Sequence, residues 1–430
     1  MEEIKVKETN EVIYHEVLDN GLDIYFHPNN NSKNFYMALG TKYGATYTTF
    51  KRKDEKEYHH TPNGVAHFLE HITFHLDGKE ATELFTPYGA YINAFTSHNR
   101  TCYVVDGNNG FNECLDNLLY YVYTPYYTEE TVEKEKGIIK EECKRCDDDP
   151  NRVFYQNKMK AIFHKSNHRE KVVGELDEIE SITLDDINNA YNTFYNPGYM
   201  YLLISGNFDM NEAMDTIQKR LSTFTFDEFK GVDIEIPDEE LKVNKEYDEL
   251  EANVMNAKAS YQLKISKDVI KETGLSLYEY YTYLELILSA NLDGTSDYYK
   301  ELLEKDIVPF PCGVWADLKD NYIIIDISNS PKEGKIDEFI KITEKYINNL
   351  SINEDVIKRK IKCRISDYIL LFDSNDGIVH GIMEDIIYFD KYRDDTLSVA
   401  KNFTTENGEK VLKTISTNNK SIVILKSKSE

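Results

Sequence analysis

Two histidines and a glutamate fill three of the five positions in His67-Phe68-Leu69-Glu70-His71. The run 64–74 is typical of a helix, and side chains four residues apart on a helix lie one above the other. The rings of His67 and His71 can therefore hold one metal ion at about 2 Å from a nitrogen of each. Glu70 can reach a water on that ion. This H-x-x-E-H arrangement suits a carboxylate that acts as general base toward a zinc-bound water.

The helix around this motif is expected to have Thr61 as a fair N-cap and Pro62 at its first helical position. An alternative is that the histidines belong to a solvated helix face. The apolar residues around the motif argue for a packed helix instead; they are Val65, Phe68, Leu69, Ile72 and Phe74. His75 would extend the histidine face, but eight residues of helix span about 12 Å, too far for one ion. We therefore expect His75 to pack or to form hydrogen bonds.

Charge and composition exclude several classes of function. The 430 residues include 50 Lys and Arg against 76 Asp and Glu, a net charge of −26. Such an acidic surface repels phosphate, so we expect no nucleic-acid partner and no membrane-surface role. Hydrophobic residues make up 41% of the chain, as in globular proteins. No apolar run reaches the roughly 20 residues of a membrane span, and residues 1–7 lack the apolar core of a signal peptide. These features predict a cytoplasmic protein.

The six cysteines are too few for a disulfide framework in a chain of this length. Cys143 and Cys146 form a C-x-x-C pair, but no second pair follows. A structural zinc site or a redox role for this pair is therefore the less favoured interpretation, and we expect free thiols on a helix.

The first half of the chain alternates between strand and helix patterns. Two strands, 12–14 and 22–26, flank the turn Asp19-Asn20-Gly21, which favours a hairpin. Later strands are expected at 35–39, 90–96, 100–105 and 199–205, and helices at 79–85, 110–123, 128–146, 150–165, 183–195 and 211–221.

The second half runs in the same order as the first. The acidic stretch 227–253, which contains Pro237, is expected to be a linker. Strands are then expected at 257–263, 321–327 and 421–425, with helices at 275–290, 335–350 and 353–372. We therefore predict an α+β fold of two similar tandem domains, each a mainly antiparallel sheet packed with helices: residues 1–226 with the metal motif and 254–430 without it.

A weak internal repeat supports this division. Setting Leu76-Asp77-Gly78 on Leu292-Asp293-Gly294 pairs the three motif residues with Tyr283, Leu286 and Ile287, so only the first repeat is expected to carry metal chemistry. The alternative is an accidental register.

Four segments together resemble the insulinase and pitrilysin family of zinc peptidases, in the branch that includes the mitochondrial processing peptidases. They are 66–71, 93–97, 135–142 and the stretch from Val173-Gly174-Glu175 to Ser181-Ile182-Thr183. The resemblance implies one zinc ion per chain, with Glu142 as third ligand beside His67 and His71. It places Glu135 two turns earlier, where it would orient a histidine or a water. Glu141 is the rival ligand if the register slips by one residue.

The resemblance also implies a peptide substrate and a place for it. The segment Asn93-Ala94-Phe95-Thr96 would be an edge strand beside the metal, to which a peptide adds by backbone hydrogen bonds. An ordinary sheet strand is the alternative reading, and both can hold.

The chain departs from the family in its second half. Active single-chain members carry an arginine and a tyrosine seven residues apart, and the matching positions here are Leu303 and Phe310. Neither side chain can donate a hydrogen bond to the developing oxyanion. We therefore expect a paired homologous subunit that supplies these donors, in a heterodimer, with a homodimer as the second choice.

Together these inferences predict a zinc-dependent endopeptidase that cleaves short or unfolded peptides in a closed chamber, with Glu70 as its base. The alternative is a non-catalytic metal-binding or scaffold subunit of a peptidase-like complex.

Overall fold

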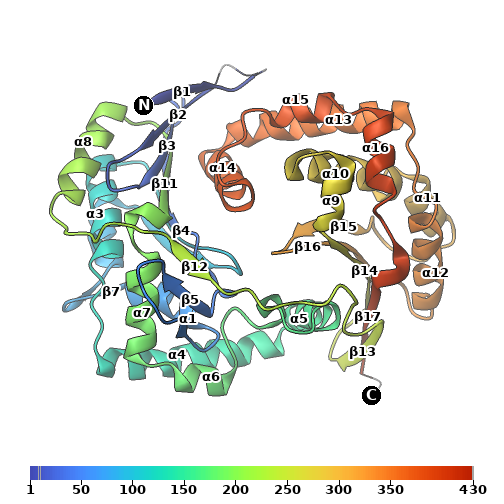
Figure 1. The fold of residues 1–430 in the computed structure, drawn as a ribbon, viewed down its shortest axis with the longest axis horizontal. Helices are drawn as coiled ribbons and strands as arrows, with labels where there is room; N and C mark the ends of the chain where they lie inside the picture. Colours follow the sequence, from blue (N-terminus) through green and yellow to red (C-terminus); the bar gives the residue numbers. More distant parts are fainter. Residues whose placement is uncertain (8, 10, 429–430) are drawn as a thin grey trace. The chain divides into compact units, whose positions relative to one another are not determined.

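The computed structural model describes residues 1–428 apart from 8 and 10 (Figure 1). Contacts between residues divide them into two compact units. The first unit holds Met1–Arg145, Glu170–Ile236 and Ile369–Asp394. The second holds Cys146–Arg169, Pro237–Tyr368 and the chain from Asp395 onward.

A seven-stranded sheet forms the centre of the first unit. Its order is β1 (Glu2–Lys5), β2 (Val12–Val17), β3 (Asp23–Pro28), β11 (Met200–Gly206), β4 (Phe35–Thr41), β10 (Thr101–Gly107) and β9 (Tyr91–Thr96). Every neighbouring pair is antiparallel except β3 and β11. The central strand β11 is buried along its whole length, and β9 lies at the edge of the sheet. Gly21 adopts a φ of 89° in the turn before β3, as its place in the expected hairpin requires.

Helices and short strands surround this sheet. The helices are α1 (Val65–Thr73), α2 (Thr82–Phe85), α3 (Phe111–Tyr123), α4 (Glu129–Asp148), α6 (Leu176–Ser181), α7 (Leu184–Phe194), α8 (Met210–Leu221) and α14 (Asn375–Phe389). Helices α3 and α8 pack side by side (Figure 1). The short strands are β5 (Thr49–Arg52), β6 (His59–His60) and β12 (Val232–Ile234) in one sheet, and β7 (His75–Leu76) with β8 (Lys79–Glu80) in another.

Helix α1 begins later than the sequence predicts. Gly64 is its N-cap, with a φ of 93°, so the helix does not include Thr61 or Pro62. A Cβ at Gly64 would lie 2.6 Å from the carbonyl oxygen of Val173, so this distant segment requires a glycine at the helix start. The expected helix start was wrong because it considered only neighbours in sequence.

The end of the same helix also differs from the expectation. Helix α1 ends at Thr73, and His75 lies in strand β7, not on the helix face. Residues 79 and 80 form strand β8, which pairs with β7. The helix expected at 79–85 is therefore reduced to α2, Thr82–Phe85.

The second unit has a five-stranded sheet. Its order is β13 (Tyr247–Ala252), β17 (Lys420–Ser427), β14 (Lys258–Ser266), β16 (Tyr322–Asn329) and β15 (Gly313–Leu318). Its helices are α5 (Pro150–Ile162), α9 (Asp268–Thr273), α10 (Leu277–Leu292), α11 (Asp297–Glu304), α12 (Ile336–Ile347), α13 (Glu354–Leu370), α15 (Thr396–Lys401) and α16 (Thr405–Leu412).

The two sheets share one topology. In each, a parallel pair is followed by three antiparallel pairs: β3-β11-β4-β10-β9 in the first and β13-β17-β14-β16-β15 in the second. Helix α10 lies between β14 and β15 in the chain, as α1 lies between β4 and β9. Its Tyr283, Leu286 and Ile287 are buried and bring no metal ligand. The prediction of two similar α+β domains, each with a mainly antiparallel sheet, is confirmed.

Two segments cross between the sequence halves, so the compact units differ from the expected division at residues 226 and 253. Helix α14 packs against β11 and β4 of the first unit, and α5 packs against β17 of the second. The expected linker 227–253 is partly structured, because β12 pairs with β5 and β13 pairs with β17. The boundaries drawn from the sequence remain a proposal about the two repeats.

Among the described residues, no helix combines the length and the apolar character that a membrane span requires.

Candidate metal centre

Helix α1 is buried around most of its surface, and His71 is its one partly exposed residue. Phe68, Leu69 and Ile72 are fully buried, and their packing fixes the rotation of the helix. The rings of His67 and His71 then lie together, with centroids 4.6 Å apart.

Helix α4 brings Glu142 to these two rings. Its Oε2 lies 3.6 Å from Nε2 of His67 and 3.3 Å from Nε2 of His71. Ligand atoms at about 2.1 Å from a tetrahedral zinc ion are separated by about 3.4 Å, so one ion fits between these three atoms. His67, His71 and Glu142 form the candidate metal group among the described residues. The donor set of two imidazoles and one carboxylate also suits zinc.

Glu141 does not join the metal group. Its side chain is 66% exposed and bonds to Lys144 at 2.6 Å. Adjacent residues on a helix point in different directions, so only one of the two glutamates can face α1. The structure places Glu142 there.

Glu135 contacts the metal group from behind His71. Its Oε1 accepts a hydrogen bond from Nδ1 of His71 at 2.9 Å. This bond keeps the proton on Nδ1 and leaves Nε2 toward Glu142, which is the tautomer that a metal ligand needs. Burial acts to raise the pKa of Glu135, but the bonds from His71 and His75 lower it to about 2.

His71 is protonated at neutral pH in the absence of metal. Burial acts to lower its pKa, but the hydrogen bonds to Glu135 and Glu142 raise it to about 9. A metal ion that binds Nε2 must therefore displace a proton.

Glu70 is buried next to the metal group and is not part of it. It accepts a hydrogen bond from Oγ1 of Thr96 at 2.7 Å. Burial raises the pKa of Glu70, while the bond from Thr96 and the charge of His71 oppose that rise. A carboxylate with a raised pKa beside a metal-bound water is suited to exchange a proton with it.

Residues Asn93–Thr96 lie in β9, the edge strand of the sheet, which pairs with β10 on one side. Helix α1 packs against β9, and Thr96 makes the contact with Glu70. On α14, the ring of His380 lies 5.9 Å from the ring of Phe95. The strand that was expected to receive a peptide therefore borders both the metal helix and a helix from the second half of the sequence.

Sequence reasoning missed three contacts at this site. It did not foresee the bond from Thr96 to Glu70, the bond from His75 to Glu135 or the approach of His380. The sequence analysis expected Glu135 to orient a histidine or a water and His75 to pack or to form hydrogen bonds, but it did not pair these two residues with each other. Leu303 and Phe310 are exposed by 53% and 50% in the second unit and, as expected, offer no donor.

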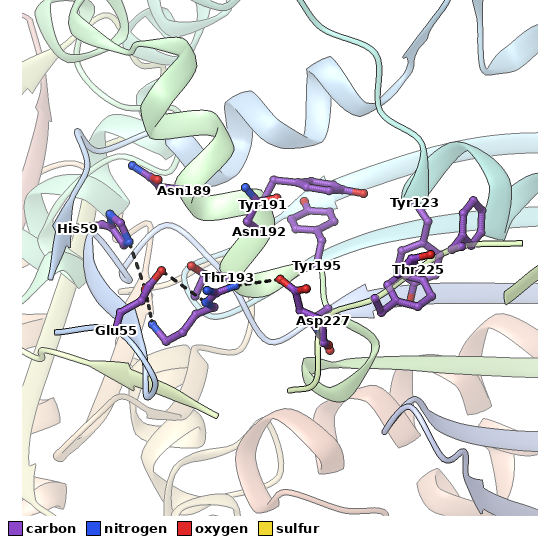
Figure 2. Close-up of a pocket in the computed structure, with 14 residues that line it drawn as sticks. Glu55, His59, Tyr123, Asn189, Tyr191, Asn192, Thr193, Tyr195, Thr225 and Asp227 are labelled. Carbon is purple, nitrogen blue, oxygen red and sulfur yellow. Dashed lines mark hydrogen bonds and ion pairs between the residues drawn. The ribbon is translucent and has the colours of Figure 1, made fainter. Parts of the chain in front are cut away.

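A separate pocket of about 440 Å³ lies in the same unit (Figure 2). Figure 2 shows Glu55 and His59 toward one end of the pocket and Tyr123 toward the other. Arg52, which also lines the pocket, bonds to Asp227 at 3.3 Å. Tyr195 in its wall contacts Tyr103 hydroxyl to hydroxyl at 2.8 Å, and Tyr103 donates to Thr73 at the end of α1. The pocket shares no lining residue with the metal group.

Comparisons with known proteins show which family and which fold the chain resembles. A family model described as insulinase (peptidase family M16) matches residues 57–176, and one described as peptidase M16 inactive domain matches residues 181–361. The chain is 32% identical to the uncharacterized zinc protease YmfH of Bacillus subtilis. The alignment spans 305 residues, which are 71% of each protein. An M16-like protein from Alicyclobacillus acidocaldarius has the same fold, with a TM-score of 0.90 and 22% identity over 98% of this chain and 100% of that one. Pitrilysin matches with a TM-score of 0.76 and 16% identity, over 99% of this chain and 46% of its own.

Proposed function

The chain belongs to the insulinase (M16) family of peptidases, and we propose that it is a zinc-dependent endopeptidase for short or unfolded peptides. The observation that carries the proposal is the convergence of His67, His71 and Glu142 on one point, with the buried carboxylate of Glu70 beside it. A scaffold protein has no need of a general base at that place.

The residues of the chain divide the reaction between them. His67, His71 and Glu142 would hold the zinc ion, which when bound polarises a carbonyl and lowers the pKa of a water. Glu70 takes a proton from the water while the water oxygen forms a bond to the carbonyl carbon of the peptide. Glu70 then gives that proton to the leaving amine as the C–N bond breaks. Strand β9 holds the substrate backbone at Asn93–Thr96, and Glu135 keeps His71 in the right orientation.

A partner subunit is part of this proposal. The chain spans less than half the length of pitrilysin, so it corresponds to one half of that larger fold. Leu303 and Phe310 offer no donor to an oxyanion. A homologous subunit that supplies arginine and tyrosine donors in a heterodimer would complete the site and close the chamber, and a homodimer is the second choice.

We also propose a reducing compartment, the cytoplasm. In the part of the chain that the structure describes, the six cysteines form no disulfide, and five of them, the C-x-x-C pair included, are buried. Buried free thiols are usual in proteins that work under reducing conditions.

The alternative is a non-catalytic subunit that binds metal or serves as a scaffold. It is favoured by the match of residues 181–361 to a domain described as inactive and by the missing donors. That match begins only at residue 181, however, and the H-x-x-E-H motif lies within residues 57–176, which match the insulinase model.

The test measures zinc content and peptide cleavage on the same samples. We expect wild-type protein to hold one zinc ion per chain and to cleave an unfolded reporter peptide once a co-purifying partner is added. Glu70→Gln should keep the zinc and lose at least about a hundredfold in rate. Equal cleavage by Glu70→Gln would show that Glu70 is not the base. A wild-type chain that holds zinc but cleaves nothing, alone or with its partner, would favour the non-catalytic alternative.

A further inference from the structure

The carboxylate of Glu135 has a second partner besides His71. Its Oε2 lies 3.0 Å from Nε2 of His75, while Oε1 receives the bond from His71. Each oxygen thus meets one imidazole. The Glu135 side chain is only 5% exposed, so little water competes for these bonds. Its orientation is therefore set from two sides, by the candidate metal ligand and by His75.

His75 is in turn held by Glu80. Its Nδ1 lies 2.9 Å from Oε1 of Glu80. Strands β7 and β8 pair His75 directly with Glu80, so the backbone of this hairpin brings the two side chains together. A continuous chain of hydrogen bonds results, from Glu80 through His75 and Glu135 to His71.

These hydrogen bonds link His75 to the candidate metal ligand His71 through Glu135. Without the bond from His75, one oxygen of a buried carboxylate would lose its partner, and Glu135 could turn away from His71. His71 would then lose the contact that holds its ring and its tautomer. Outer partners of metal-binding histidines commonly tune metal affinity by such contacts.

We propose that His75, held by Glu80 in the β7–β8 hairpin, is a positioning residue that orients Glu135 and so strengthens zinc binding at His67, His71 and Glu142. This inference rests on the proposed metal site. The hydrogen bonds of the His75 ring go to Glu80 and Glu135, so its effect on the metal group passes through Glu135.

The experiment measures zinc affinity by competition with a chromogenic chelator. His75→Phe fills the space of the ring without its nitrogens and should weaken zinc binding about 10- to 100-fold. His75→Gln keeps a donor toward Glu135 and should recover part of the loss. Lys79→Ala, at an exposed position of the same hairpin, is the matched control and should bind zinc as wild type does. Glu80→Gln tests the outer link and should show a smaller loss.

A double-mutant cycle separates a positioning role from a general structural one. In a Glu135→Gln background, His75→Phe should cause little further loss, because its effect passes through Glu135. The absorption spectrum of bound Co²⁺ should change in His75→Phe and stay unchanged in Lys79→Ala. An equal loss in both backgrounds, or an affinity of His75→Phe within twofold of wild type, would overturn the inference. If wild-type protein binds no zinc, the proposed function fails first, and that result is distinct.

Discussion

Thr96 on the edge strand β9 donates a hydrogen bond to Glu70 on α1, with 2.7 Å between Oγ1 and Oε2. The bond joins the strand proposed to bind the peptide to the carboxylate proposed as base. Since a peptide added to β9 takes its register from that strand, the same bond would align the scissile carbonyl with Glu70.

Thr96→Val should move the acid limb of the pH profile of kcat/KM to higher pH. The bond from Thr96 lowers the pKa of Glu70 against the effect of burial, so its loss raises that pKa further. A base must be deprotonated to act, so activity would be lost at a higher pH as the solution is made more acidic. The measurement is peptide cleavage across pH 5 to 9. Thr96→Ser keeps the hydroxyl and should keep the wild-type profile. An unshifted acid limb in Thr96→Val would show that Glu70 is not the group that titrates.

Glu142→Gln and Glu141→Gln should have opposite outcomes although the residues are adjacent. Glu142 faces both histidines, and Glu141 faces solvent and Lys144. Loss of a ligand charge should weaken zinc binding by more than about a hundredfold, while the exposed change should leave it unaltered. Zinc content after dialysis, measured by atomic emission, distinguishes the two. Zinc loss in Glu141→Gln alone would mean that the register of α4 is shifted by one residue.

The sequence was sufficient to predict features that depend on local spacing. The i, i+4 rule placed His67 and His71 together, and the expected strands were found with shifts of a few residues at their ends. Features that depend on distant contacts could not be predicted. The start of α1 is set by the close approach of Val173 to Gly64, and the place of α14 by packing on β11 and β4. His75 was expected to extend the helix face because no break signal lies before Asp77-Gly78, and the β7–β8 pairing takes it off the helix.

Zinc affinity should rise with pH between pH 6 and 8.5. The pKa of His71 in the metal-free protein is raised to about 9, so zinc displaces one proton throughout this range. One displaced proton gives about a tenfold gain in apparent affinity per pH unit below that pKa. The raised pKa of His71 also adds to the free energy of unfolding of the metal-free protein. This contribution is complete below pH 6.5, the ordinary pKa of histidine, and is lost as the pH rises through about 9.

Calorimetry in buffers of different ionisation enthalpy can count the displaced proton directly. Glu135→Gln removes a bond that raises the pKa of His71, so in this variant the pH dependence should flatten at a lower pH. Zinc affinity that stays constant from pH 6 to 8.5 would contradict protonation of His71 in the metal-free site.

Asn375→Leu should loosen the first unit although residue 375 lies in the second half of the sequence. Asn375 is buried at the start of α14, where it accepts a bond from Ser205 at 3.1 Å and donates to Ser32 and to Asn34. Loss of these bonds leaves buried polar groups without partners and costs about 1–3 kcal/mol. Amide exchange in β11 and α14 should therefore speed up roughly 5- to 150-fold where it occurs by local opening. Exchange in β16 of the second unit serves as the internal control. Asp373→Asn, at an exposed position just before α14, should change neither. If Asn375→Leu leaves β11 protected, α14 does not stabilise the unit that carries the metal centre.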